Sequence, residues 1–154
     1  NWTSIGPFCN IDAAAMAYDP WITHNSSNIY VSWSEKNAEA RQIYVQYWTG
    51  SNWQSVGGSL NVDYQKNAYY PELIINDSNI PYVAFLEERG SISHLYLKRY
   101  YNNLWELVGG RYWNVDYDRS IFNFGFVYGD KPYLTFMEQF GSESQKVRVK
   151  TTTN

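Results

Sequence analysis

The sequence predicts an all-β fold, and three observations support this prediction. Aromatic side chains, which favour strands, make up 19% of the 154 residues. Short apolar runs are separated by clusters of Asn, Gly, Ser and Asp, in the way that strands are separated by turns. The chain also consists of one sequence unit of about fifty residues that occurs three times, and no copy shows a helical stripe of apolar residues.

The repeat is marked most clearly by Trp and Gly. The segment Trp53–Gly57 matches Trp2–Gly6 and Trp105–Gly109, at spacings of 51 and 52 residues. An Asn-x-Asp element follows in each copy, with one extra residue before the third: Asn10/Asp12, Asn61/Asp63 and Asn114/Asp116. We therefore divide a single domain, 1–154, into approximate repeats 1–52, 53–104 and 105–154.

Each repeat contains three more strand-like elements. The first comprises residues 21–23, 73–75 and 125–127. The second comprises 29–35, 81–87 and 132–138, and the third 43–46, 95–98 and 147–150.

Four short antiparallel strands that recur every ~40–50 residues are the pattern of a β-propeller blade. Blades pack on both faces, so their strands carry apolar residues at successive positions, as Tyr82–Leu86 does. We expect three four-stranded antiparallel blades per chain. The elements at 21–23, 73–75 and 125–127 are expected to lie innermost and the Trp-containing elements outermost.

Closed propellers have ~4–8 blades, so three blades need further copies to complete a ring. One expectation is a homodimer with six blades, in which Trp2–Gly6 of one chain pairs with Lys146–Thr151 of the other. The alternative is that the repeats belong to a longer propeller. The lack of an initiator Met before Asn1 suggests a segment of something larger.

The second copy also carries a family resemblance. Its Trp-x-x-Val-Gly-Gly-x-Leu-Asn motif, 53–61, and the later motifs Pro81–Phe85 and Leu95–Lys98 resemble the blade repeat of bacterial extracellular or surface propeller proteins. The first copy departs from the motif at Pro7 and Cys9, and the third has Phe124 where the second has Pro71. The resemblance implies an extracellular or cell-surface location and no single activity.

Charge and cysteine content exclude several classes of partner. The net charge of -3 and the pI near 5.3 give no basic surface for nucleic acid or an anionic membrane. No apolar run is long enough for a membrane-spanning helix. A single cysteine, Cys9, permits neither an intrachain disulfide nor a zinc cluster, and we expect no metal and no cofactor.

Polar residues that recur in every copy have two interpretations. The Asn-x-Asp elements and the recurring glutamates, Glu35, Glu87 and Glu138, offer oxygen atoms for calcium or for sugar hydroxyls. Short Asn and Asp side chains also stabilise their own loops. The structural interpretation is favoured, because it explains why every copy has them.

Residues that break the repeat are better candidates for a ligand site, since the scaffold does not require them. Seven are expected on or near the face shared by the loops that enter the innermost strands and the loops that join the second strands to the third: Arg41, Gln42, Tyr70, Arg89, His94, Tyr117 and Arg119. Aromatic rings beside polar groups suit a sugar, which stacks on a ring and donates and accepts hydrogen bonds.

The main functional hypothesis is a non-catalytic propeller, carbohydrate-binding like a lectin or acting as an adhesin. His24 and His94 have no equivalent histidines in the other copies and suggest no catalytic triad, so the chain is not expected to be an enzyme. One alternative is a structural propeller that binds a protein and no sugar. Another is part of a propeller glycosidase that uses Glu72, Asp116 or Glu138.

Overall fold

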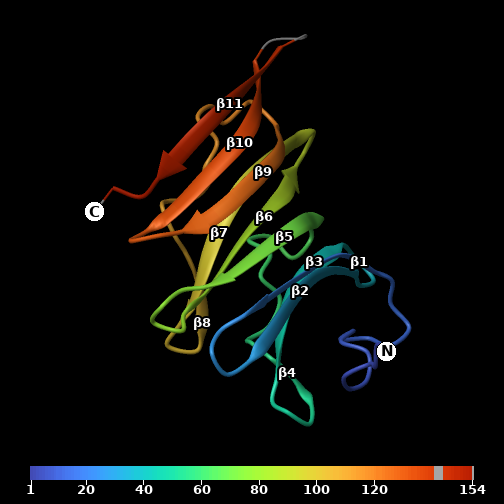
Figure 1. Cartoon of the computed structure of the whole chain (residues 1–154). Helices are drawn as coiled ribbons and strands as arrows, with labels where there is room; N and C mark the ends of the chain where they lie inside the picture. The colour runs from blue at the N-terminus through green and yellow to red at the C-terminus, as the bar shows by residue number, and fades with distance from the viewer. Residues whose placement is uncertain (141–143, 154) are drawn as a thin grey trace.

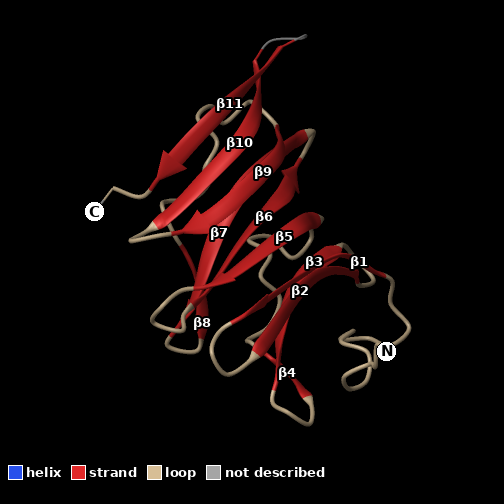
Figure 2. Ribbon diagram, viewed as in Figure 1, coloured by secondary structure: helices blue, strands red, loops and turns tan. Residues whose placement is uncertain are grey.

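The computed structural model describes residues 1–140 and 144–153, and its regular structure there is entirely β (Figures 1 and 2). The strands form three antiparallel sheets. The first contains β1 (Ala17–His24), β2 (Ile29–Lys36), β3 (Arg41–Trp48) and β4 (Trp53–Ser55). The second contains β5 (Ala68–Ile75), β6 (Pro81–Arg89), β7 (Ile92–Tyr101) and β8 (Leu104–Leu107). The third contains β9 (Ile121–Tyr128), β10 (Pro132–Phe140) and β11 (Ser144–Thr151).

The strand order confirms the predicted blade. Neighbouring strands in the sequence are neighbours in each sheet, from β1 to β4, from β5 to β8 and from β9 to β11. The Trp-containing element of one repeat forms the outermost strand of the preceding sheet, because β4 pairs with β3 and β8 with β7. The sheets follow one another face to face, as propeller blades do (Figure 1).

The third sheet differs from the expectation of four strands. Among the described residues it has three, and no strand pairs with the free edge of β11. In the first two sheets the outermost strand is the Trp element of the following repeat. The first Trp element, Trp2–Gly6, is exposed and forms no strand.

The middle sheet shows why blades need neighbours. All seven residues from Pro81 to Glu87 of β6 are buried, so both faces of this strand are covered. One core, which includes Ile43 and Phe85, joins the first and second sheets. Another core, which includes Leu97 and Phe136, joins the second and third. The predicted burial of both faces is confirmed.

In the described part of the chain no helix is long and apolar enough to cross a membrane.

Each innermost strand contains an irregularity near its start. The pairing register shifts between Tyr18 and Trp21 in β1 and between Tyr69 and Glu72 in β5. The equivalent shift in the third sheet lies opposite the β10 segment between Phe136 and Glu138. Such bulges change the direction in which side chains point and are common beside functional sites.

Candidate functional site

The recurring glutamates hold the loops that lead into the innermost strands. Each carboxylate accepts hydrogen bonds from two successive backbone N–H groups of its loop. Glu87 accepts from Val62 at 2.6 Å and from Asp63 at 3.2 Å. Glu35 binds the loop at residues 11–12, and Glu138 the loop at 115–116, in the same way.

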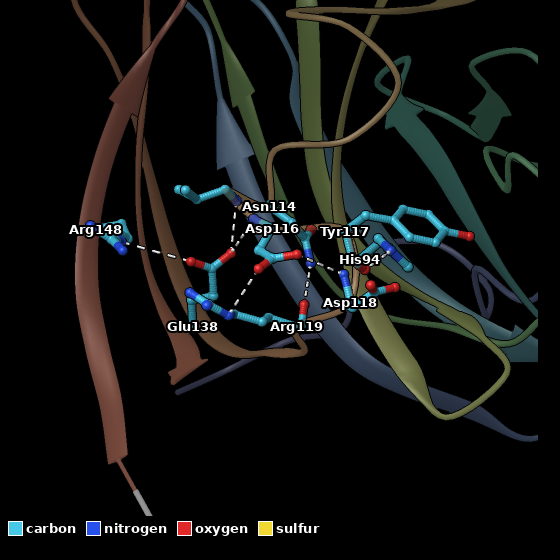
Figure 3. A network of polar contacts seen from close by, with 9 residues as sticks. His94, Asn114, Asp116, Tyr117, Asp118, Arg119, Glu138 and Arg148 are labelled. Atoms are coloured by element: carbon cyan, nitrogen blue, oxygen red, sulfur yellow. Dashed lines mark hydrogen bonds and ion pairs between the residues drawn. The ribbon is translucent and has the colours of Figure 1, made fainter. Parts of the chain in front are cut away.

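The Asn-x-Asp elements stabilise the same loops. The Nδ2 of Asn114 donates to the carbonyl of Arg119 at 2.6 Å, and its Oδ1 accepts from the N–H of Leu95 at 3.0 Å. Oδ1 of Asp116 accepts from the N–H of Asp118 two residues later (Figure 3). These bonds confirm the structural interpretation of the recurring polar residues. Asp116 and Glu138 are therefore occupied in the loop, which leaves Glu72 of the three proposed catalytic carboxylates.

Two of the predicted ligand residues, Gln42 and His94, occupy equivalent structural positions. The Nε2 of Gln42 donates to the carbonyl of Tyr64 at 2.7 Å. The Nε2 of His94 lies 3.0 Å from the carbonyl of Tyr117. Both side chains are buried, and burial lowers the pKa of the His94 imidazole. Tyr117, another predicted residue, is exposed and lies against this histidine, with ring centroids 4.9 Å apart.

The three predicted arginines lie apart from one another. The guanidinium of Arg41 lies 3.6 Å from the centre of the Tyr18 ring, at the start of β3. Arg119 pairs with Asp116 at 3.1 Å, in a different loop, and Arg89 ends β6. Of the seven predicted residues only Tyr70 lines the pocket described next. The structure therefore brings His94 and Tyr117 together, and places Arg41, Arg119 and Tyr70 in other segments.

A pocket of about 300 Å³ lies where the innermost strands of the three sheets come together. Its walls are the bulged segments of β1, β5 and β9, three residues from each. These are Asp19, Pro20, Trp21, Tyr70, Pro71, Glu72, Phe122, Asn123 and Phe124. Because the innermost strands surround the axis in a propeller, we call this the axial pocket.

The pocket combines positions at which the repeats diverge. Asp19 and Tyr70 are equivalent, each at a bulge and with a positive φ of 52° and 53°. Trp21 and Glu72 are also equivalent, and Gly125 takes their place in the third sheet. Scaffold requirements do not explain such different side chains at matched positions. This divergence was visible in the sequence, but the bulges that turn these residues towards one pocket were not.

Glu72 supplies a partly buried carboxylate to the axial pocket. Its Oε2 accepts a hydrogen bond from the N–H of Phe126 in the neighbouring sheet, at 2.8 Å. Burial raises the pKa of Glu72 above its ordinary value, although this hydrogen bond favours the charged form. Trp21, the equivalent residue of the first sheet, also bonds to the next sheet. Its Nε1 donates to the carbonyl of Leu73 in β5 at 3.1 Å.

Asp19 supplies a second carboxylate from the adjacent sheet. Its Oδ2 accepts from the hydroxyl of Ser34 at 3.1 Å and from the N–H of Tyr70 at 3.4 Å. The aromatic side chains of the pocket are partly open to solvent, with 43% of Trp21, 56% of Tyr70 and 42% of Phe122 exposed. Rings for stacking and oxygens for hydrogen bonding therefore face the same space.

The described residues show no cluster of metal-binding side chains at this pocket. Within residues 1–140 and 144–153, no group of three or more His, Cys, Asp or Glu side chains is placed to hold a metal ion. Cys9 is a free thiol whose pKa is raised by burial. The chemistry of the pocket rests on its carboxylates and rings.

The fold resembles solved structures of glycoside hydrolases. A glycosyl hydrolase from Bacteroides ovatus matches 79% of this chain with a TM-score of 0.55 and 10% identity. A predicted glycoside hydrolase from Parabacteroides distasonis and a predicted glycosidase from Bacteroides thetaiotaomicron each match 88% of it, with TM-scores of 0.55 and 0.54 and identities of 10% and 11%. This chain spans less than half of each of those chains, between 45% and 48%. Searches with family models and among curated proteins gave no match.

These structures contradict the expectation that the chain is not an enzyme. All three are described as hydrolases or glycosidases, so the architecture suggested for a lectin is one that glycosidases use. At 10% to 11% identity the likeness establishes the fold.

Proposed function

We propose that this chain forms part of a propeller-type glycoside hydrolase that binds a sugar in the axial pocket and uses Glu72 as proton donor. The observation that supports this most is the composition of the pocket. Carboxylates reach it from two neighbouring sheets, and aromatic rings reach it from all three.

The rings suit the apolar faces of a sugar. Trp21, Tyr70 and Phe122 come from different sheets, line the pocket and are partly exposed. A sugar ring stacks on such faces through its C–H groups, while its hydroxyls bond to carboxylates and amides. Asn123 and Asp19 lie in the same lining and supply such groups.

The environment of Glu72 suits an acid. Glycoside hydrolysis needs one carboxyl group that is protonated near neutral pH, and burial is the usual means of raising its pKa. Glu72 is the pocket carboxyl whose pKa is raised in this way. We assign it the transfer of a proton to the oxygen of the leaving group. We assign the role of the second carboxylate to Asp19, which lines the same pocket.

The test compares leaving groups that need different amounts of protonation. Initial rates are measured on xylo-, arabino-, manno- and cello-oligosaccharides and on the 4-nitrophenyl glycosides of the same sugars. Glu72→Gln keeps an oxygen for the N–H of Phe126 but cannot donate the proton. We expect at least ~100-fold loss on the oligosaccharide that is cleaved, as for loss of a general acid. The loss on its 4-nitrophenyl glycoside should be much smaller, because nitrophenolate leaves without help.

Glu106→Gln is the matched control. Glu106 lies in β8 and pairs with Arg99 at 3.2 Å, away from the axial pocket. The rates of the Glu106→Gln variant should therefore stay within about twofold of those of the unmodified protein. Absence of turnover on every substrate would contradict the proposal. Equal losses for both leaving groups would contradict the role of Glu72 as proton donor.

A further inference from the structure

The outer edge of β11 lacks the strand that its counterparts have. In the first two sheets the third strand is paired by a Trp-containing strand, β4 on β3 and β8 on β7. In the third sheet no strand of the described chain pairs with β11 on that side. Two side chains of β11, Val147 and Val149, are exposed by 71% and 70%. An open edge beside exposed apolar residues favours pairing with another strand.

The missing strand has a counterpart elsewhere in this chain. Trp2–Gly6 carries the same motif as β4 and β8 with their following Gly, but its Trp2 is fully exposed. Figure 1 shows the N-terminal segment beside the first sheet and β11 at the opposite end of the molecule. The segment and the edge of one chain therefore lie apart.

The end of Trp2–Gly6 already has the conformation of a paired outermost strand. Gly6 has a φ of 68°, close to 70° at Gly57 and 78° at Gly109. Gly6 packs against Trp48 and Trp53 as Gly57 packs against the equivalent Tyr100 and Trp105. The ring centroids in both aromatic pairs are 5.2 Å apart. This segment thus occupies the place that an outermost strand of a preceding sheet would take.

The indole N–H of Trp53 lacks the hydrogen bond that its counterpart makes. The Nε1 of Trp105 donates to the carbonyl of Val56 at 2.8 Å. The equivalent Nε1 of Trp53 is buried and has no partner among the described residues. The matching acceptor is the carbonyl of Ile5, within the unpaired segment. Buried donors without partners cost free energy, so ordering this segment into a strand is favoured.

We propose that a second copy of this chain pairs with the open edge, so that Trp2–Gly6 of each copy becomes the outermost strand beside β11 of the other. The exchange is reciprocal, as a two-fold interface requires. Two copies supply six sheets, within the ~4–8 of closed propellers, and cover the exposed face of the third sheet. Their combined length is close to that of the glycoside hydrolases that this chain half covers. The inference is independent of catalysis.

The repeat fixes the register of this pairing. Tyr47 pairs with Gln54, and Arg99 pairs with Glu106 at the equivalent place. The same positions in the proposed interface are Thr151 and Thr3. Residues directly opposite in antiparallel strands have Cβ atoms ~4.5–5.5 Å apart, a distance that a disulfide spans with a small adjustment.

Cross-linking tests the partner and the register together. Thr3→Cys and Thr151→Cys are combined in a chain in which Cys9→Ser removes the native thiol, and the protein is oxidised at low concentration. We expect a covalent dimer of twice 18.0 kDa on a non-reducing gel. The control combines Thr3→Cys with Val147→Cys, which the register keeps apart, and should give little dimer. Sedimentation of the unmodified protein should show the same dimer without cross-links.

Each other outcome overturns the proposal. A cross-link within one chain, seen as a monomer without free thiols, would mean that the segment pairs with its own β11. Equal dimer yields from both cysteine pairs would mean contact without register. A monomer with two free thiols would mean that the edge is covered by something other than a second copy, such as further repeats. None of these measurements uses a substrate, so they succeed or fail separately from the glycosidase test.

Discussion

At the scale of single residues, recurrence and divergence separate structural from functional side chains. Glu87 recurs in each copy and is buried against the N–H groups of Val62 and Asp63. Glu72 has no acidic equivalent and lines the axial pocket. The sequence was sufficient to assign the first role, since a scaffold contact must recur. It was insufficient for the second, because residues such as His94 also diverge and yet serve the scaffold.

Asn114→Ala should destabilise the fold strongly. Its side chain bonds to the backbone of Leu95, Ser93 and Arg119, and alanine leaves these buried groups without partners. We expect the free energy of unfolding to fall by about 2–4 kcal/mol, measured by urea denaturation. Asn123→Ala, at an exposed position of the pocket, should change it by less than about 0.5 kcal/mol. Similar losses in both variants would contradict the structural role of Asn114.

Glu87 should make stability depend on pH. Burial raises its pKa from the ordinary 4.5 to about 7 in the folded protein. A raised pKa contributes stability that is full below 4.5 and is lost as the pH rises through about 7. As the pH rises from 5 to 8, the unmodified protein should therefore lose more unfolding free energy than Glu87→Gln does. A difference that does not change with pH would contradict this protonation behaviour.

At the scale of elements, strands and their order follow from the apolar pattern, but their irregularities do not. The segment 81–87 was predicted as a strand buried on both faces, and β6 has this property. The bulge between Tyr69 and Glu72 depends on how β5 pairs with β6, which the sequence of one strand does not determine. The axial pocket consists of such bulges. For this reason its lining was missed, apart from Tyr70 and, in the glycosidase alternative, Glu72.

The Gly that ends each Trp element should be essential to how blades meet. Gly57 has a φ of 70°, and a Cβ there would lie 2.9 Å from Nε1 of Trp105 and 3.0 Å from Tyr100. Gly57→Ala should therefore cost the ~1–2 kcal/mol of a left-handed residue and a further loss of packing. Gly50 has a φ of 96° with open space around it, so Gly50→Ala isolates the backbone cost. If Gly57→Ala and Gly50→Ala lower the temperature of thermal unfolding equally, close packing at Gly57 is contradicted.

At the scale of the whole molecule, three sheets surround part of an axis and leave the outer edge of β11 unpaired in the described chain. The blade architecture was predictable because buried faces repeat along the chain, as at Tyr82 and Phe85. The third sheet has three strands in the described chain instead of four, and the strand expected beside β11 was the Trp element of another chain. The proposed sugar site lies at this axis, between divergent residues of the three sheets.

The indole N–H signal of Trp21 tests this claim most directly. Seven tryptophans give separate signals in a nitrogen–proton correlation spectrum, and Trp21→Phe identifies the one in the pocket. We predict that titration with the oligosaccharide series shifts the Trp21 signal in a saturable way, while the signal of the exposed Trp2 stays in place. If every oligosaccharide leaves Trp21 unchanged, or binds and shifts other tryptophans only, the axial pocket is not the sugar site.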